Sequence, residues 1–321
     1  MVRLDEICFG IELETTQATR QRVAEAICSV VGGEVVYIGY PTVYDPWEVR
    51  DDQGRVWRVV ADSSLQSAPP ERRAEIVSPI LTAADIPTLQ AVVRAVRRTG
   101  AIAGPDAGIH VHLSHPSVTP KALANLAKLV YKQEPIIYAA LGVSPDRMAR
   151  FCKPINPEFI KRITKTPPRS FAKLNTQWYG KFNPSPQRYD KSRYHVLNFN
   201  AYFLRGAVEL RAFSGSLHAG RIKAVIFFSL ALFARALNAH GASAKKRIYN
   251  PATAKFDFRV FLISALKLNG PTFKTTRQHL LALMPGDSAF KYGASQRPKR
   301  TAKKTTEETP GAGAEMLRPS C

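Results

Sequence analysis

The 321-residue sequence is poor in cysteine and in acidic residues, and it has no long apolar run. Its cysteines, Cys8, Cys28, Cys152 and Cys321, form no CxxC pair, which argues against a structural zinc site and provides no disulfide framework. The N-terminus lacks the basic-then-apolar pattern of a signal peptide. The most apolar stretch, residues 224–234, is too short to span a bilayer. We therefore expect a cytoplasmic protein that has no membrane partner.

Several common catalytic motifs are also missing. The chain contains neither a P-loop nor a GxGxxG pattern, so a Walker or Rossmann nucleotide site is not expected. It contains neither a GxSxG nucleophile elbow nor an HExxH metal motif. Any nucleotide or metal site must therefore be built from other residues.

Positive charge is abundant: Lys and Arg number 46 against 25 Asp and Glu, for a formal charge of +21. Residues 147–193 hold twelve Lys or Arg and only two acids, so we expect an irregular basic insertion or lid there. Residues 291–321 are polar and low in complexity, which predicts a disordered basic tail. The basic segment and the residue that follows it also carry aromatic side chains that suit base stacking, which makes a nucleic-acid-binding protein one candidate. These aromatic residues are Trp178, Tyr179, Phe182, Tyr189 and Tyr194.

Hydrophobic periodicity predicts a chain of mixed strands and helices. The expected strands are residues 5–14, 34–38, 56–61, 75–81, 109–114, 195–202 and 207–213. The expected helices are residues 16–31, 85–99, 121–141, 219–239 and 256–268. Residues 41–54 should be a polar insert, Pro135 should kink or break its helix, and the last two strands should turn at Arg205-Gly206.

Three dyads with i, i+2 spacing occur in strand-like contexts, where both members project from one face of a sheet. They are Glu12/Glu14 in FGIELE, His110/His112 in GIHVHLS and Glu209/Arg211 in AVELRAF. Brought together, they would provide carboxylates, imidazoles and a guanidinium suited to divalent metal and phosphate chemistry. Taken singly, each has an ordinary alternative: a solvated face, a pair of half-buried histidines, or an ion pair.

Two further acids lie beside predicted strands, Glu75 in EIVSP and Asp62 in DSSL. Each also fits a solvated carboxylate at the edge of a loop. Arg193 and Arg205 precede the last dyad in sequence and could add guanidinium groups that bind phosphate.

The order of these motifs resembles the putative amidoligase family, which comprises carboxylate–amine ligases related to glutamine synthetase and glutamate–cysteine ligase. The resemblance covers residues 8–217 and six short motifs: FGIELE, WxVxxDSSL, EIVSP, GIHVHLS, RYHVLNFN and AVELRAFSGSL. Ser63 stands where the family usually has a glycine, which leaves the carboxylate of Asp62 in place.

The resemblance implies an α+β fold, in which a curved antiparallel β-sheet of glutamine-synthetase catalytic type forms a funnel with helices packed outside. Residues 1–290 would be the catalytic domain, with ATP and Mg²⁺ or Mn²⁺ inside the funnel. The metal ligands implied are Glu12, Glu14, Glu75, His110 and Glu209. The phosphate-contacting residues implied are His112, Arg193 and Arg211.

The activity implied is ATP-dependent amide formation through an acyl phosphate, from a carboxylate acceptor and an amine donor. Asp62 is our candidate for the group that deprotonates the amine, and residues 147–193 could close over the site. The basic segment suits an acidic acceptor, such as a peptide, a protein or a glutamyl-like carboxylate. A nucleic-acid-binding protein and a metal-dependent hydrolase remain alternatives.

Overall fold

Eight strands form one open sheet in the computed structural model, which describes residues 1–39 and 44–292. They lie in the order β2-β3-β4-β5-β1-β6-β8-β7, and every neighbouring pair is antiparallel. Their bounds are β1 Cys8–Thr16, β2 Glu34–Tyr37, β3 Trp47–Arg50, β4 Val56–Val60, β5 Arg73–Val77, β6 Gly108–Ser114, β7 Leu197–Asn198 and β8 Val208–Ser214. The predicted mixture of strands and helices is confirmed as an open antiparallel sheet with helices, whereas the funnel stays a prediction.

The helices lie between and after these strands. Their bounds are α1 Arg20–Val31, α2 Ile86–Arg98, α3 Pro120–Leu141, α4 Pro145–Arg150, α5 Pro157–Lys165, α6 Phe171–Tyr179, α7 Asn200–Arg205, α8 Ala219–Asn238, α9 Ala254–Val260 and α10 Lys274–Leu281. Short 3-10 helices are Leu4–Glu6, Pro70–Arg72, Ala83–Asp85 and Lys191–Tyr194, and Phe261–Ala265 is a π-helix. No helix within the described residues is long and apolar enough to cross a membrane.

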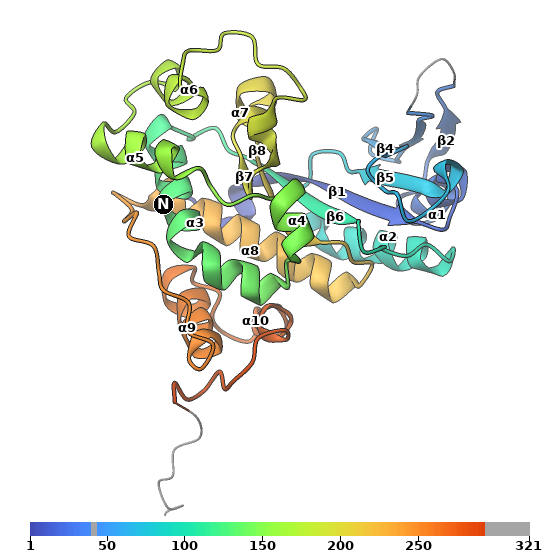
Figure 1. Cartoon of the computed structure of the whole chain (residues 1–321). Coiled ribbons are helices and arrows are strands. Elements are labelled where there is room, and N and C mark those ends of the chain that lie inside the picture. The colour runs from blue at the N-terminus through green and yellow to red at the C-terminus, as the bar shows by residue number, and fades with distance from the viewer. Residues whose placement is uncertain (40–43, 293–321) are drawn as a thin grey trace, which may run out of the picture.

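One face of the sheet is covered by helices and forms the core. Helices α1, α3 and α8 contact the strands, and α2 lies between α1 and α8 (Figure 1). Phe9, Ile11 and Leu13 of β1 point into this layer, as do Ile109 and Val111 of β6, and all five are buried. Because side chains alternate along a strand, the residues between them project from the other face of the sheet.

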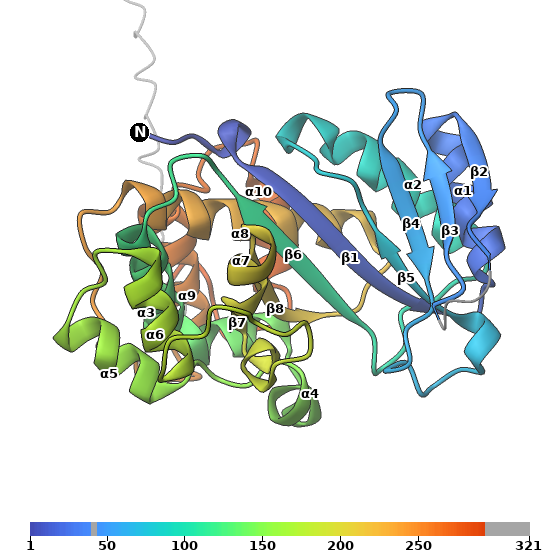
Figure 2. The same ribbon diagram turned by 90° about the horizontal axis from the view of Figure 1, so that it is seen from above.

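The opposite face of the sheet is flanked by two parts of the chain. Seen from above, strands β2, β3 and β4 lie at one edge, and helices α4 to α7 lie near the other (Figure 2). We refer to residues 147–193, which include most of α4 and all of α5 and α6, as the basic segment.

The expectation that the basic segment would be irregular is wrong, because it contains three helices. Ser144, Asn156 and Ser170 precede α4, α5 and α6, and each side-chain oxygen accepts a hydrogen bond from an N–H in the first turn. Prolines occupy the first positions of α4 and α5, where they favour helix initiation. The stretch between α6 and the 3-10 helix at 191–194 remains irregular.

The predicted hairpin at residues 195–213 is only partly correct. Strand β7 pairs with β8, but it ends at Asn198, and the expected remainder of the strand is helix α7. The Asn198 side-chain oxygen accepts a hydrogen bond from the backbone N–H of Ala201 at 3.2 Å, which starts the helical turn. Gly206 ends the helix with a φ of 74°.

Two further expectations need correction. The polar insert at 41–54 contains strand β3, which pairs with β2 and β4 and buries Val49, while residues 40–43 lie outside the described chain. Helix α3 also continues through Pro135, which contradicts a helix break there, while a kink at Pro135 stays a prediction. Of the predicted tail, residues 293–321 fall outside the part of the chain that the structure describes.

Candidate active site

The pairing of strands brings the three dyads together on the uncovered face of the sheet. Glu12 of β1 lies opposite His110 of β6, and Glu14 lies opposite Glu75 of β5. His112 of β6 in turn lies opposite Glu209 of β8. Residues separated by up to about two hundred positions therefore share one surface.

An irregularity in β8 determines the face of the sheet on which Glu209 and Arg211 lie. Ile109 pairs with Phe213 but Val111 pairs with Leu210, so β8 has one extra residue opposite this part of β6. Such a β-bulge lets Leu210 and Phe213 both reach the core, where both are buried. It also leaves Arg211 on the same face as Glu209, and the two side chains form an ion pair.

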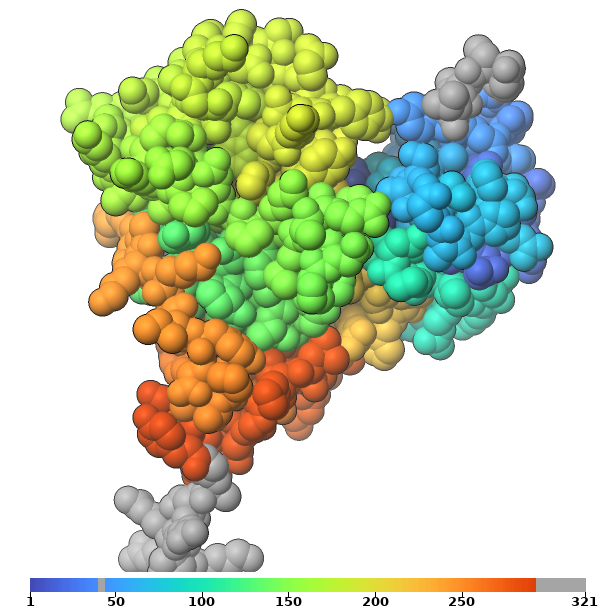
Figure 3. All heavy atoms as spheres, viewed as in Figure 1, coloured from blue at the N-terminus to red at the C-terminus, as the bar shows by residue number. Residues whose placement is uncertain are grey.

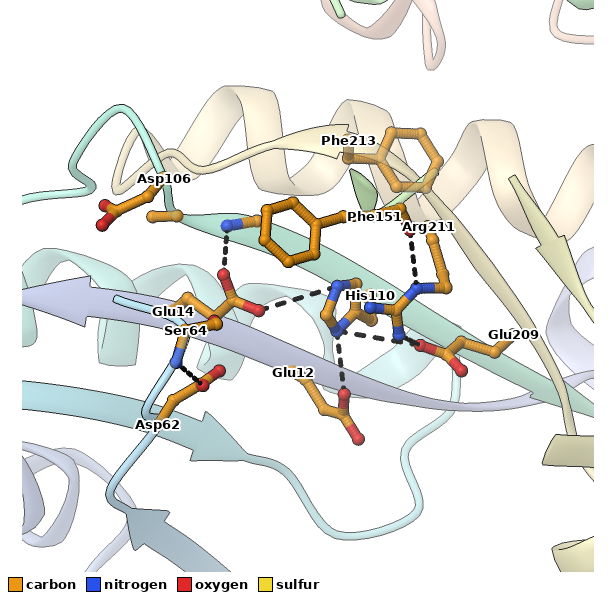
Figure 4. A network of polar contacts seen from close by, with 12 residues as sticks. Glu12, Glu14, Asp62, Ser64, Asp106, His110, Phe151, Glu209, Arg211 and Phe213 are labelled. Carbon is orange, nitrogen blue, oxygen red and sulfur yellow. Dashed lines mark hydrogen bonds and ion pairs between the residues drawn. The ribbon is translucent and has the colours of Figure 1, made fainter. Parts of the chain in front are cut away.

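His110 lies at the centre of two overlapping groups of acidic side chains (Figure 4). Its Nδ1 atom is 2.9 Å from Glu12 Oε2 and 3.7 Å from Glu209 Oε1, and its Nε2 atom is 3.6 Å from Glu14 Oε1. Ligand atoms of Glu12, His110 and Glu209 lie within 4.8 Å of one another, as do those of Glu14, Glu75 and His110. Each set has the oxygen and imidazole donors that divalent metal ions accept.

The carboxylates of the two groups ionise differently. Burial raises the pKa of Glu75 well above its usual value, and the nearby charges of Glu12, Glu14 and Asp62 raise it further. Burial also raises the pKa of Glu14. Burial acts on Glu12 as well, but the imidazoles around it prevail and hold its pKa well below the usual range. A cation beside Glu75 and Glu14 would remove the cost of ionising both.

Glu209 is held by neighbours on two strands. Its Oε2 atom accepts a hydrogen bond from Asn198 Nδ2 of β7 at 2.6 Å, and its other oxygen contacts Arg211. Burial opposes its ionisation, but the Arg211 guanidinium outweighs burial and lowers the pKa of Glu209 to about 2. Arg211 Nε also donates to the carbonyl of Phe151 at 3.2 Å. Both side chains are therefore charged and fixed in position.

A cavity of about 450 Å³ opens beside Glu14 and Glu75 on the uncovered face of the sheet. Its walls come from two parts of the chain that lie side by side in Figure 3, the β2–β5 region in blue and the basic segment in green and yellow-green. The acidic lining residues are Glu14, Asp62, Glu75 and Asp106, and the arginines are Arg73, Arg147, Arg188, Arg193 and Arg211. The aromatic lining residues are Tyr44, Phe151, Tyr189 and Tyr194.

The two remaining sequence candidates, Asp62 and Arg193, also line this cavity. Asp62 Oδ1 accepts a hydrogen bond from the backbone N–H of Ser64 at 2.7 Å, which leaves its other oxygen free of hydrogen bonds within the described residues. Arg193 donates to the carbonyl of Arg188 at 3.3 Å. His112, by contrast, does not line the cavity, and its Nε2 atom is 3.1 Å from Glu12 Oε1.

Sequence reasoning missed Arg147, which is 3% exposed and reaches the cavity from α4. Its guanidinium donates to the carbonyls of Asp106 and Ala107 at 3.2 and 3.1 Å and to that of Phe213 at 3.4 Å. It thereby fastens α4 to the ends of β6 and β8. Nothing in the local sequence distinguishes Arg147 from the other basic residues of its segment.

Asn198, Tyr44 and Arg188 were also missed. Asn198 lies within the RYHVLNFN motif, so that motif contained a signal that we did not use. Trp178, which we considered for base stacking, is 6% exposed and packs against Phe159 and Phe199 in the core.

A sequence profile of the family described as "putative amidoligase enzyme" matches residues 5–233, which include all the residues discussed above. This match covers most of the chain, so the protein belongs to that family, and the family indicates a ligase activity. No curated protein matches the chain.

Proposed function

We propose that this protein is an ATP-dependent ligase that joins a carboxylate to an amine through an acyl phosphate. The observation that supports this proposal most is the pair of overlapping metal-ligand groups that share His110, with Arg211 and His112 beside them. Family membership supports the ligase class. Neither a nucleic-acid-binding protein nor a hydrolase accounts for that membership.

The donor set fits divalent metal ions. Glu12, His110 and Glu209 would hold one ion, and Glu14 and Glu75 would hold another together with His110. Within the described residues the Glu75 carboxylate accepts no hydrogen bond, and burial and like charges raise its pKa, so a bound cation would favour its ionised form. When bound, Mg²⁺ or Mn²⁺ would offset the negative charge of the phosphates and polarise the transferring phosphoryl group.

The side chains around the two metal-ligand groups supply the remaining functions. Arg211 is fixed by Glu209 and the carbonyl of Phe151, so its free donors can stabilise the transferring phosphoryl group, together with His112 and Arg193. Attack requires a neutral amine, and the free oxygen of Asp62 can accept the proton of an ammonium group. The basic segment forms one wall of the cavity and limits the access of water, which would hydrolyse an acyl phosphate.

The proposal predicts that purified protein with Mg²⁺ and ATP releases ADP only when a suitable carboxylate and amine are present. Mass spectrometry should detect the new amide. Glu12→Ala and Glu209→Ala should lower turnover by at least about a thousandfold, because each removes a ligand from the shared cluster. Glu25→Ala, an exposed change on α1, serves as the matched control.

Wild-type turnover by either site variant would show that the metal assignment is wrong. Cleavage of a substrate without ATP consumption would instead support the metal-dependent hydrolase.

A further inference from the structure

Arginine and acidic side chains line the same cavity, but those that the structure describes form no ion pairs with one another across it. Of its five arginines, only Arg211 has a carboxylate within salt-bridge distance among the described residues. Asp62 and Glu75 likewise have no basic partner within the described chain. Unpaired guanidiniums facing unpaired carboxylates across a cavity suit a ligand that brings its own anion to the arginines.

The arginines of one wall are arranged on tyrosine rings. The Cζ atom of Arg188 lies 5.6 Å from the ring centre of Tyr44 and 5.5 Å from that of Tyr189. The two tyrosine hydroxyls are 2.5 Å apart, which links the β2–β5 region to the basic segment across the cavity. We call Tyr44, Arg188 and Tyr189 the arginine–tyrosine wall. A guanidinium stacked on a ring keeps its N–H edge free, and that edge matches the two oxygens of a carboxylate.

The position of this wall distinguishes two sources of anion, the nucleotide phosphates and the acceptor. Glu12 and His112 do not line the cavity, whereas Glu14 and Glu75 do, so the wall adjoins one metal group and His112 adjoins the other. Arg193 and Arg211, which we assign to the transferring phosphoryl group, also line the cavity. That group passes from the nucleotide to the acceptor, so it would lie between the two. The rest of the nucleotide would then lie toward His112, and the acceptor would lie in the cavity beside Arg188. The surplus of positive charge in the basic segment would attract the same kind of molecule.

We infer that the arginine–tyrosine wall selects an acidic acceptor, one that carries a second carboxylate in addition to the carboxylate that is activated. This inference rests on the proposed ligase function and specifies its substrate class. Arg188 binds the second carboxylate, and Tyr189 supports the Arg188 guanidinium. The cavity volume of about 450 Å³ suits an acidic side chain presented by a short peptide.

Three capped dipeptides test this directly, because their blocked ends leave only side-chain carboxylates. Acetyl-Glu-Glu-amide has two, acetyl-Gln-Glu-amide has one and acetyl-Gln-Gln-amide has none. Calorimetry with Mg²⁺ and ADP present should show that wild-type protein binds the first at least about tenfold more tightly than the second, as expected for one charge-assisted contact.

Arg188→Gln should remove this tenfold preference while leaving the affinity for Mg²⁺–ADP within twofold of wild type. Arg169→Gln is the matched control, since it removes the same charge from an exposed position of the basic segment outside the cavity. Tyr189→Phe keeps the ring and should keep the preference, whereas Tyr189→Ala should lose it.

Three results would overturn the inference: equal binding of the one- and two-carboxylate peptides, absence of binding by wild-type protein at millimolar peptide, or a loss of ADP affinity in Arg188→Gln. The last result would assign the wall to the nucleotide phosphates. The proposed function is tested by a different result. If the protein prefers the two-carboxylate peptide and loses that preference in Arg188→Gln, but releases no ADP, the acidic ligand is supported and the ligase activity is contradicted.

Discussion

Glu75 is the residue whose ionisation is most unfavourable in the site. Its pKa is raised by burial first and then by Glu12, Glu14 and Asp62, so folding favours its protonated form. The stabilisation from this effect is complete below the pKa of the unfolded chain and is lost as pH rises through the higher pKa of the folded state. In protein stripped of metal, Glu75 therefore destabilises the fold at neutral and alkaline pH.

Glu75→Gln should remove the free-energy cost of ionising this buried carboxyl group, since glutamine keeps the shape without the charge. In EDTA, urea unfolding should show that the variant is more stable than wild type at pH 8 and nearly equal to it at pH 4.5. Glu25→Gln, exposed on α1, should show no such difference. A variant that is less stable than wild type at pH 8 would mean that the Glu75 carboxylate has a favourable partner within the protein.

Among the helices, α6 shows how an aromatic residue can be misjudged from sequence. Trp178 lies edge to face with Phe159, with ring centres 4.9 Å apart. Its indole N–H donates to Ser192 Oγ at 2.9 Å, which ties α6 to the turn that carries Arg193. This side chain thus supports the cavity wall from inside the core.

We predict that Trp178→Ala destabilises the protein by about 3–5 kcal/mol, the usual cost of truncating a buried large aromatic side chain. Phe182→Ala, which alters a side chain that is 55% exposed in the same segment, should cost less than about 1 kcal/mol. Thermal unfolding measures both. Equal stability of the two variants would contradict the placement of Trp178 in the core and would indicate an exposed side chain.

The sequence predicted those features of the fold and the site whose signal lies in neighbouring residues, and it did not predict features that depend on distant parts of the chain. Alternation in FGIELE and GIHVHLS placed their strands and the functional faces of Glu12 and His110, because a period of two is written in the sequence itself. The bulge in β8 and the helix after Asn198 were missed, since each depends on a partner strand or on one side-chain hydrogen bond. The buried arginine at 147 was missed because its acceptors are carbonyls from distant segments.

At the level of the whole molecule, metal ions should couple the site to global stability. The ligands of the two groups come from β1, β5, β6 and β8, so an ion in each group would hold three strands and the two ions together would hold four. A metal at a hundred times its Kd stabilises the bound state by about 2.7 kcal/mol.

We therefore expect saturating Mg²⁺ or Mn²⁺ to raise the unfolding midpoint by at least about 5 °C and EDTA to reverse the change. Glu12→Ala and Glu209→Ala should reduce this shift, because each removes a ligand of one of the two metal-ligand groups and leaves the other group intact. Glu25→Ala should retain it. A full shift in the site variants would place the ion elsewhere.

The pairing of β1 with β6 and of β6 with β8 also has a consequence for how the chain acquires its site. The Glu12–His110 contact joins residues 98 positions apart, and Glu209 arrives later still on β8. Contacts of such high sequence separation form slowly, because a long loop must close before any of them is made. A nascent chain on the ribosome therefore exposes a carboxylate-lined half-sheet until β8 docks, which makes β8 the step that completes the site during synthesis.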